Sequence, residues 1–316
     1  MKLRTEIFIP ESEKKITHHD KTYFSGSCFS ENIASKMKYY GFDVLSNSHG
    51  ILFNPVSIKH GFMDLVLQKT YRTTDLRTAN DIYFSYAHHG SFNSNQPEKI
   101  LEKINGSITE HAAHFFESKF VIITLGSSWV YETIENKRIA ANCHKQPSSF
   151  FNKRLLSLEE ITDSLQATIE LIGSVTKAEI IFTLSPVKHL KDGFIENQHS
   201  KSLLHIAIQK ALKTGVSYFP AYEIMMDDLR DYRFWSEDMV HPNELAINYI
   251  WEKFSGIYFD ENTNNIMKDV NSFRQLTNHR SLSSDPKEIE DLKIRKEKAF
   301  QKITNKYPHI KIDYES

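Results

Sequence analysis

The sequence predicts an α/β fold, with a central, mostly parallel sheet covered by helices on both faces. Three short apolar runs, at 22–24, 120–125 and 179–184, are each followed by small or polar residues. Apolar runs of this length are typical of parallel strands that are buried on both faces. Helical patterns lie between them, and strands that alternate with helices favour a parallel sheet. Ligands bind such sheets at the carboxyl ends of the strands.

The other elements of this sheet are predicted from the hydrophobic period along the chain. A helix with apolar residues at 33–37 should follow the first strand and end at Gly41, because glycine commonly ends helices. The further candidates are, in chain order, a strand at 42–45, a helix with apolar spacing over 165–172, a second such helix over 203–212 and a strand at 216–219.

The last part of the chain is predicted to be helical. Pro242 suits the first turn of a helix whose apolar stripe, at 246–254, should pack in the core. Beyond residue 259 the composition becomes polar. We expect a loop at 260–265, and then a segment at 281–285 that opens a charge-rich helix around 285–306.

The charge-rich helix mixes acidic and basic side chains, which is typical of a solvated face, and docking to a partner is the alternative. We therefore predict a main domain over residues 1–260. A charged helical extension over 261–316 should pack on this domain or trail from it.

Charge and cysteine content exclude several classes of function. The 39 basic and 40 acidic residues give a net charge of −1, so neither nucleic acid nor an anionic membrane is an expected partner. The first residues hold no apolar stretch of signal-peptide length, and no run reaches the roughly 20 apolar residues of a membrane span. Cys28 and Cys143 are the two cysteines, which suits a reducing, cytoplasmic location. No dinucleotide or Walker loop occurs, and we expect no cofactor.

Gly26, Ser27 and Cys28 form the most informative motif. They follow the first strand directly and precede a helical pattern, so two candidate nucleophiles lie on a tight strand-to-helix turn. Such a turn holds the side chain at the carboxyl edge of the sheet and directs backbone N–H groups and the helix dipole at it.

Asp238 and His241 provide the base that either nucleophile would need. Ester hydrolysis through an acyl-enzyme requires a nucleophile, a base beside it, an acid that orients the base, and donors for the oxyanion. Asp238 lies three residues before His241 in a predicted loop, so its carboxylate can reach the imidazole. The alternative is that Asp238 only forms a turn and that His241 only lies at the start of a helix.

Seven motifs together resemble the GSCFA-domain family, which belongs with the SGNH/GDSL hydrolases. They fall in the order of that family and span roughly residues 4–260. In this sequence they read RTEIFIP at 4–10, GSCFSENI at 26–33, GILFNP at 50–55, TLGSSWVYE at 124–132, NCHK at 142–145, TLSPV at 183–187 and DMVHP at 238–242.

The resemblance implies a three-layer α/β/α sandwich and ester hydrolysis, and it leaves two candidate nucleophiles. The first block of SGNH enzymes reads Gly-Asp-Ser-Leu, with the serine as nucleophile. The ungapped alignment puts Cys28 at the serine and Ser27 at the aspartate. A shift of one residue would expose Ser27 instead. The thiol is easily activated at a helix N-terminus, and we favour Cys28.

The resemblance also points to the oxyanion hole. The third block appears as Gly126, Ser127 and Ser128, without the asparagine that SGNH enzymes place there. Ser128 could donate its hydroxyl, and Asn54 is a possible replacement donor from another loop, or an extended turn residue before Pro55.

The family motif alone places His144 near the pocket. There it would act as a second base or form a hydrogen bond to the substrate. Zinc-binding spacing is absent, and we expect no metal. The adjacent pairs His18–His19 and His88–His89 are expected at the surface or in loops.

We therefore expect a hydrolase of a small acyl ester, with an acylated sugar among the candidate substrates. Cys28 or Ser27 attacks after His241 takes its proton, Asp238 orients His241, and backbone N–H groups near Gly26 hold the oxyanion. An acyltransferase with the same residues, and a non-catalytic carbohydrate- or partner-binding module, are the alternatives. The sequence does not predict an oligomeric state.

Overall fold

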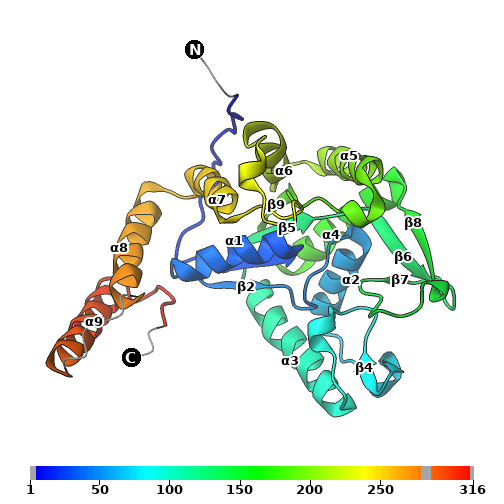
Figure 1. The fold of residues 1–316 in the computed structure, drawn as a ribbon, viewed down its shortest axis with the longest axis horizontal. Coiled ribbons are helices and arrows are strands. Elements are labelled where there is room, and N and C mark those ends of the chain that lie inside the picture. Colours follow the sequence, from blue (N-terminus) through cyan, green and yellow to red (C-terminus); the bar gives the residue numbers. More distant parts are fainter. Residues whose placement is uncertain (1–4, 279–285, 314–316) are drawn as a thin grey trace.

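A five-stranded parallel sheet forms the centre of the molecule (Figure 1). The computed structural model describes residues 5–278 and 286–313; the segment 281–285, predicted to open the last helix, lies outside the described residues. The sheet has the order β10-β9-β5-β1-β2, and all pairings are parallel. Its strands are β1 (Thr22–Gly26), β2 (Val44–Ser46), β5 (Phe120–Leu125), β9 (Glu179–Leu184) and β10 (Val216–Phe219). The predicted α/β fold is confirmed.

The strand register brings the carboxyl ends of the strands to one edge. Gly26, the last residue of β1, pairs with Thr124 of β5, and Thr124 pairs with Thr183 of β9. Side chains alternate between the two faces, as in any strand. Tyr23 belongs to the core on one face, and its neighbour Phe24 belongs to the core on the other.

Helices cover both faces and make a three-layer sandwich. One core contains residues of α2 (Pro55–Val66), α3 (Pro97–Phe116), α4 (Leu158–Val175) and α5 (Phe194–Ala211). The other contains residues of α1 (Cys28–Tyr39), α6 (Ala221–Glu223) and α7 (Glu244–Tyr258). Both cores consist of large apolar side chains, which is the burial that the apolar spacings predict.

Capping residues set where two of these helices begin. Ser27 is the N-cap of α1, in extended conformation. Asn243 is the N-cap of α7, and its side chain accepts a hydrogen bond from the Ala246 N–H at 3.1 Å. Pro242 therefore precedes the helix rather than lying in its first turn, because the asparagine side chain satisfies the free N–H groups that begin a helix.

Short antiparallel strands, which the sequence did not indicate, lie beside the central sheet. They form a three-stranded sheet of β7 (Ile139–Ala140), β6 (Trp129–Thr133) and β8 (Phe151–Leu155), and a hairpin of β3 (Arg77–Ala79) and β4 (Ile82–Phe84). Short 3-10 turns lie at 73–75, 90–92, 148–150, 190–192 and 232–234, and a π-helical turn lies at 224–228.

The C-terminal part of the chain is a pair of helices, α8 (Glu261–Asn278) and α9 (Pro286–Lys306). The prediction of a loop at 260–265 is wrong, because Asp260 caps α8 by accepting a hydrogen bond from the Thr263 N–H at 2.7 Å. Figure 1 shows the two helices side by side, away from the sheet. No helix among the described residues is long and apolar enough to cross a membrane.

The chain beyond α9 returns to the end of α1. The Lys311 N–H donates to the Gly41 carbonyl at 2.7 Å, and a Cβ on Gly41 would lie 3.2–3.3 Å from the side chains of Ile310 and Ile312. Gly41 also has a φ of +86°, which glycine adopts without strain. The division into two domains at residue 260 stays a prediction.

Candidate active site

The turn between β1 and α1 is pressed against β5 at the carboxyl edge of the sheet. Gly26 has a φ of +144°, and a Cβ on this residue would lie 2.2 Å from the Thr124 carbonyl oxygen. The Ser27 N–H donates to that same oxygen at 3.2 Å. Only glycine fits this close approach. The turn thus places Cys28 as the first residue of α1.

The two candidate nucleophiles differ in access. Ser27 is 3% exposed, and its Oγ is buried without a hydrogen-bond partner among the described residues. Cys28 is a half-buried free thiol. Within the described residues no hydrogen bond joins His241 to either side chain. Of the two, Cys28 is the one that an incoming substrate can reach.

Opposing influences act on the Cys28 thiol. Burial raises its pKa above the usual value, and the nearby Glu31 carboxylate acts in the same direction. The backbone N–H groups of Phe29 and Cys28, and the charge of Lys201, lower the pKa. These N–H groups are free at the start of a helix, so they are also donors for an oxyanion at this position.

Asp238 and His241 form a hydrogen-bonded pair on the loop before α7. Asp238 Oδ2 lies 2.6 Å from His241 Nδ1, and its Oδ1 accepts from the N–H groups of Val240 and His241 at 2.9 and 3.0 Å. The His241 N–H and imidazole and the Val240 N–H together lower the pKa of Asp238 to about 2. Both side chains are about half exposed, so His241 Nε2 is open to a substrate or water.

His189, which the sequence analysis did not single out, connects this loop to the sheet edge. The preceding Lys188 N–H donates to the Val240 carbonyl at 3.1 Å. The pKa of His189 is lowered to about 3 by burial and by repulsion from Lys201 and His241. Its Nε2 lies 3.0 Å from where a Cβ on Gly126 would be, and it has no hydrogen-bond partner among the described residues.

Lys201 of α5 is the second residue that was missed. It is 1% exposed, and its Nζ donates to the Ser185 carbonyl, just beyond β9, at 2.7 Å. Burial lowers its pKa from 10.5 to about 7, although Cys28 and Glu223 act against this. The signal in the sequence was a lysine three residues before Leu204, on the apolar face of the helix.

The side chains predicted for the oxyanion hole are engaged in other contacts. The N–H groups of Gly126 and Ser127 both donate to the Phe53 carbonyl, at 2.8 and 3.1 Å. Asn54 is 2% exposed and caps α2, with both of its amide atoms bonded to Ser57. Ser128 is fully buried, and both its N–H and its hydroxyl bond to Ser200 of α5.

His144 lies on the loop after β7, and none of its contacts leads to Cys28. Its Nε2 is 2.9 Å from the Ser85 carbonyl, its ring stacks on Phe84 at 4.7 Å, and burial lowers its pKa. These contacts hold the loop against the chain that follows β4.

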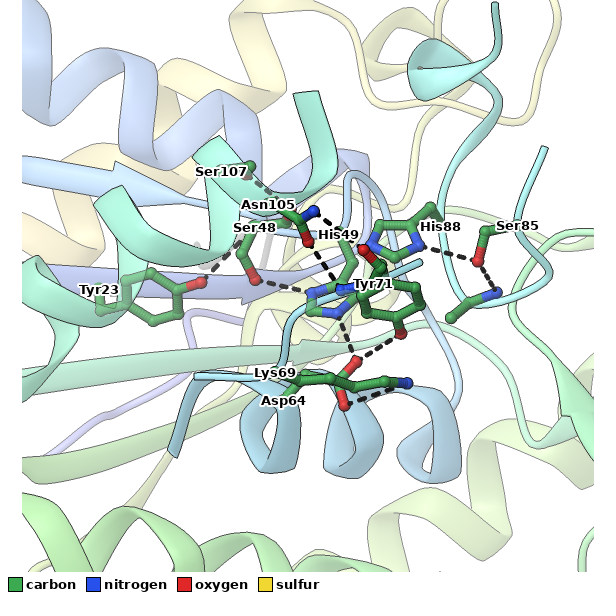
Figure 2. A network of polar contacts seen from close by, with 11 residues as sticks. Tyr23, Ser48, His49, Asp64, Lys69, Tyr71, Ser85, His88, Asn105 and Ser107 are labelled. Atoms are coloured by element: carbon green, nitrogen blue, oxygen red, sulfur yellow. Dashed lines mark hydrogen bonds and ion pairs between the residues drawn. The ribbon is translucent and has the colours of Figure 1, made fainter. Parts of the chain in front are cut away.

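A buried polar network surrounds His49, on the loop after β2 (Figure 2). His49 Nδ1 is 2.9 Å from Ser48 Oγ and its Nε2 is 3.1 Å from Asp64 Oδ2. Tyr71 donates to the same carboxylate oxygen at 2.6 Å, and the His88 ring stacks on His49 at 4.5 Å. All five residues are less than 5% exposed. The network fixes the loop after β2 against α2.

All four members of the histidine pairs lie in turns or loops, as expected, but two of them are buried rather than at the surface. His88 is fully buried in this network, and His18 is 3% exposed, with its ring stacked on Phe42 at 3.9 Å. Burial lowers the pKa of His18 to about 4 and that of His88 well below its usual value. Neutral imidazoles therefore fill positions in the core.

No group of three or more His, Cys, Asp and Glu side chains in the described part of the chain is arranged to hold a metal ion.

A family model described as the GSCFA family matches residues 21–254, from the start of the sheet into α7. Comparison with curated proteins finds no match.

Proposed function

Because the chain belongs to the GSCFA family, whose membership suggests a hydrolase-like function, we propose that it cleaves a small acyl ester through an acyl-enzyme on Cys28. The observation that carries this proposal is the Asp238–His241 pair, with Nδ1 and Oδ2 2.6 Å apart. An imidazole fixed by a carboxylate, with its other nitrogen exposed, is the arrangement of a general acid or base.

The proposed reaction assigns one step to each group. The Cys28 thiol loses its proton to a base, and Sγ forms a bond to the acyl carbon while the carbonyl electrons move to oxygen. The N–H groups at the start of α1 hold that oxygen. When the electrons return, the bond to the alcohol oxygen breaks, and protonated His241 gives the alcohol its proton.

Deacylation uses the same side chains. His241 takes a proton from water, the resulting hydroxide oxygen bonds to the thioester carbon, and the Cys28 sulfur leaves and regains its proton from the base that took it. The acid is released and the starting protonation is restored. If a sugar hydroxyl takes the place of water, the same residues catalyse acyl transfer, and we include an acylated sugar among the proposed substrates.

A second candidate function is binding without catalysis. Its support is that the N–H of Gly126 and the side chain of Asn54 are already hydrogen-bonded, so the predicted oxyanion donors are engaged. Against it stands the Asp238–His241 pair, because a binding module has no need to orient a base.

Peptide-mapped mass spectrometry after exposure to 4-nitrophenyl acetate distinguishes the two. In the wild type we expect a transient acetyl group on Cys28. In His241→Ala it should persist much longer, because a general base contributes about 10²–10⁴-fold to such a step. Cys143, the other free thiol, is the reference for non-specific acetylation in the same chain.

Two further variants complete the test. Cys28→Ala should abolish the adduct, and Ser27→Ala should leave it in place. Labelling of Cys28 no faster than of Cys143 with several acyl donors, and no dependence on His241, would favour the binding module.

A further inference from the structure

Lys201 is a buried cation without a carboxylate partner. The side chain is 1% exposed, and its one hydrogen bond among the described residues is to the Ser185 carbonyl at 2.7 Å. No described carboxylate lies within ion-pair distance of Nζ. A lysine has three N–H donors, and a charged group in the interior is costly unless it is paired. The hydrogen bond to Ser185 therefore offsets only part of the cost of burying this charge.

The backbone places Lys201 at the same corner of the sheet as Cys28. The preceding residue, Ser200, accepts a hydrogen bond from the Ser128 N–H at 2.7 Å, just beyond the end of β5. Ser185, which holds Nζ, donates its own N–H to the Leu125 carbonyl at the end of β5 at 2.8 Å. The turn that carries Cys28 is bonded to this strand as well, through Thr124.

The charges of the two side chains act on each other. The Lys201 ammonium favours the Cys28 thiolate, and the thiolate favours the ammonium. Three other groups face Lys201: the Glu223 carboxylate, the His189 imidazole, and the Tyr222 ring, whose centre is 5.3 Å from Nζ. Among these, Cys28 is the group that can give a proton to a neutral amine and then act as a nucleophile.

We propose that Lys201 takes the proton of the Cys28 thiol, and that His241 serves the leaving alcohol and the incoming water. This assignment rests on the proposed function. The S–H bond breaks, its electron pair stays on sulfur, and the proton goes to the lone pair of Nζ. The resulting thiolate and ammonium carry no net charge, and the ammonium returns the proton when the thiolate leaves the acyl group.

The proposal predicts a particular pH dependence of thiol reactivity. The reactive thiolate–ammonium form has one proton fewer than the resting acid form, so its population rises as that proton is lost. The midpoint should follow the pKa of Lys201, which is about 7. Without the lysine, Cys28 depends on its own pKa, which burial raises above the usual 9.0.

The experiment is the rate of alkylation by iodoacetamide between pH 5.5 and 9.5, measured at Cys28 and Cys143 by peptide mapping. The wild type should show a midpoint near 7 at Cys28. In Lys201→Met the rise in rate near pH 7 should be lost, and alkylation at pH 7.5 should slow, because the Lys201 charge that lowers the Cys28 pKa is gone. The rate at Cys143 should not change, and circular dichroism verifies that the variant is folded.

A second variant keeps the proposal testable if Lys201→Met does not fold. Glu223 raises the pKa of Lys201, so Glu223→Gln should move the Cys28 midpoint to lower pH while the lysine stays in place. A wild-type profile in folded Lys201→Met, or an unmoved midpoint in Glu223→Gln, would overturn the proposal.

Acetylation of the same proteins separates this proposal from the proposed function. If Cys28 is acetylated and turned over equally well with and without Lys201, the ester hydrolysis stands and the role of the lysine fails. If Cys28 is never acetylated but its alkylation depends on Lys201, the thiol–amine pair stands and the ester hydrolysis fails.

Discussion

Replacing Lys201 with methionine should remove a large pH-dependent part of the stability. The pKa of this lysine is about 7 in the folded chain and 10.5 when it is fully hydrated. Between these values the unfolded chain binds the proton and the folded chain does not. The free energy of unfolding therefore rises with pH in this window, and the contribution is lost as pH falls through 10.5 towards 7.

The magnitude follows from the two pKa values. Each pKa unit corresponds to about 1.4 kcal/mol, so the full window from 7 to 10.5 amounts to about 5 kcal/mol. Between pH 7.0 and 8.5 the gain should be about 1–2 kcal/mol. Methionine is of similar length and does not ionise, so it should show none of this gain.

The assay is urea unfolding at pH 7.0, 7.5, 8.0 and 8.5, in a Cys28→Ala background that removes the coupled thiol. The difference in unfolding free energy between this protein and Cys28→Ala/Lys201→Met should grow steadily with pH. Lys210→Met, on the exposed side of the same helix, is the matched control and should show no such trend. A difference that stays flat across the four pH values would refute the burial argument.

Three further predictions concern the turn, the buried network and the core histidines. Gly26→Ala should prevent stable folding or move the β1–α1 turn, because its Cβ would lie 2.2 Å from a β5 carbonyl oxygen; thermal unfolding with and without the substitution checks this. Tyr71→Phe should cost about 1.5–3 kcal/mol in urea unfolding, because it removes a donor to the Asp64 carboxylate; a cost under 0.5 kcal/mol would contradict this. The pKa values of His18 and His111 are lowered to about 4 by burial, so the unfolded chain binds more protons below pH 6.5 and stability should fall between pH 6.5 and 4; His18→Phe should make this fall shallower, and an unchanged slope would count against it.

Much of the central sheet could be predicted from the sequence because its strands are apolar on both faces. Residues 120–125, 179–184 and 216–219 are strands in the structure with the predicted bounds. The strands at 129–133 and 151–155 lie at the side of the molecule, where exposed and buried positions mix and no clear period remains. Their pairing depends on contacts far apart in the sequence, which a local pattern cannot show.

The candidate site likewise contains residues that the sequence indicates and residues that only the fold brings together. Cys28 and the Asp238–His241 pair lie in short motifs, where spacing within a few residues carries the chemistry. His189 and Lys201 join them only because α5 and the loop after β9 pack over the end of β5. A single lysine in an apolar helix face gives no indication of which group it will meet.

The strand order also determines the order in which parts of the protein can fold during translation. β1 pairs with β2 and with β5, so its second neighbour leaves the ribosome only after residues 120–125 have been made. The thiol turn rests on β5 through Thr124, and it cannot take its final form before then.

The fold is completed later still, because α7 is needed to cover α1 and residues 310–312 are needed to cover Gly41. A growing chain that stops short of α7 would present the apolar face of α1 to the solvent. Domains fold largely from the N-terminus during synthesis, at about 5–20 residues per second. The nascent protein thus passes many seconds with the Cys28 turn unformed and a helix face uncovered, a period in which a chaperone would find its substrate.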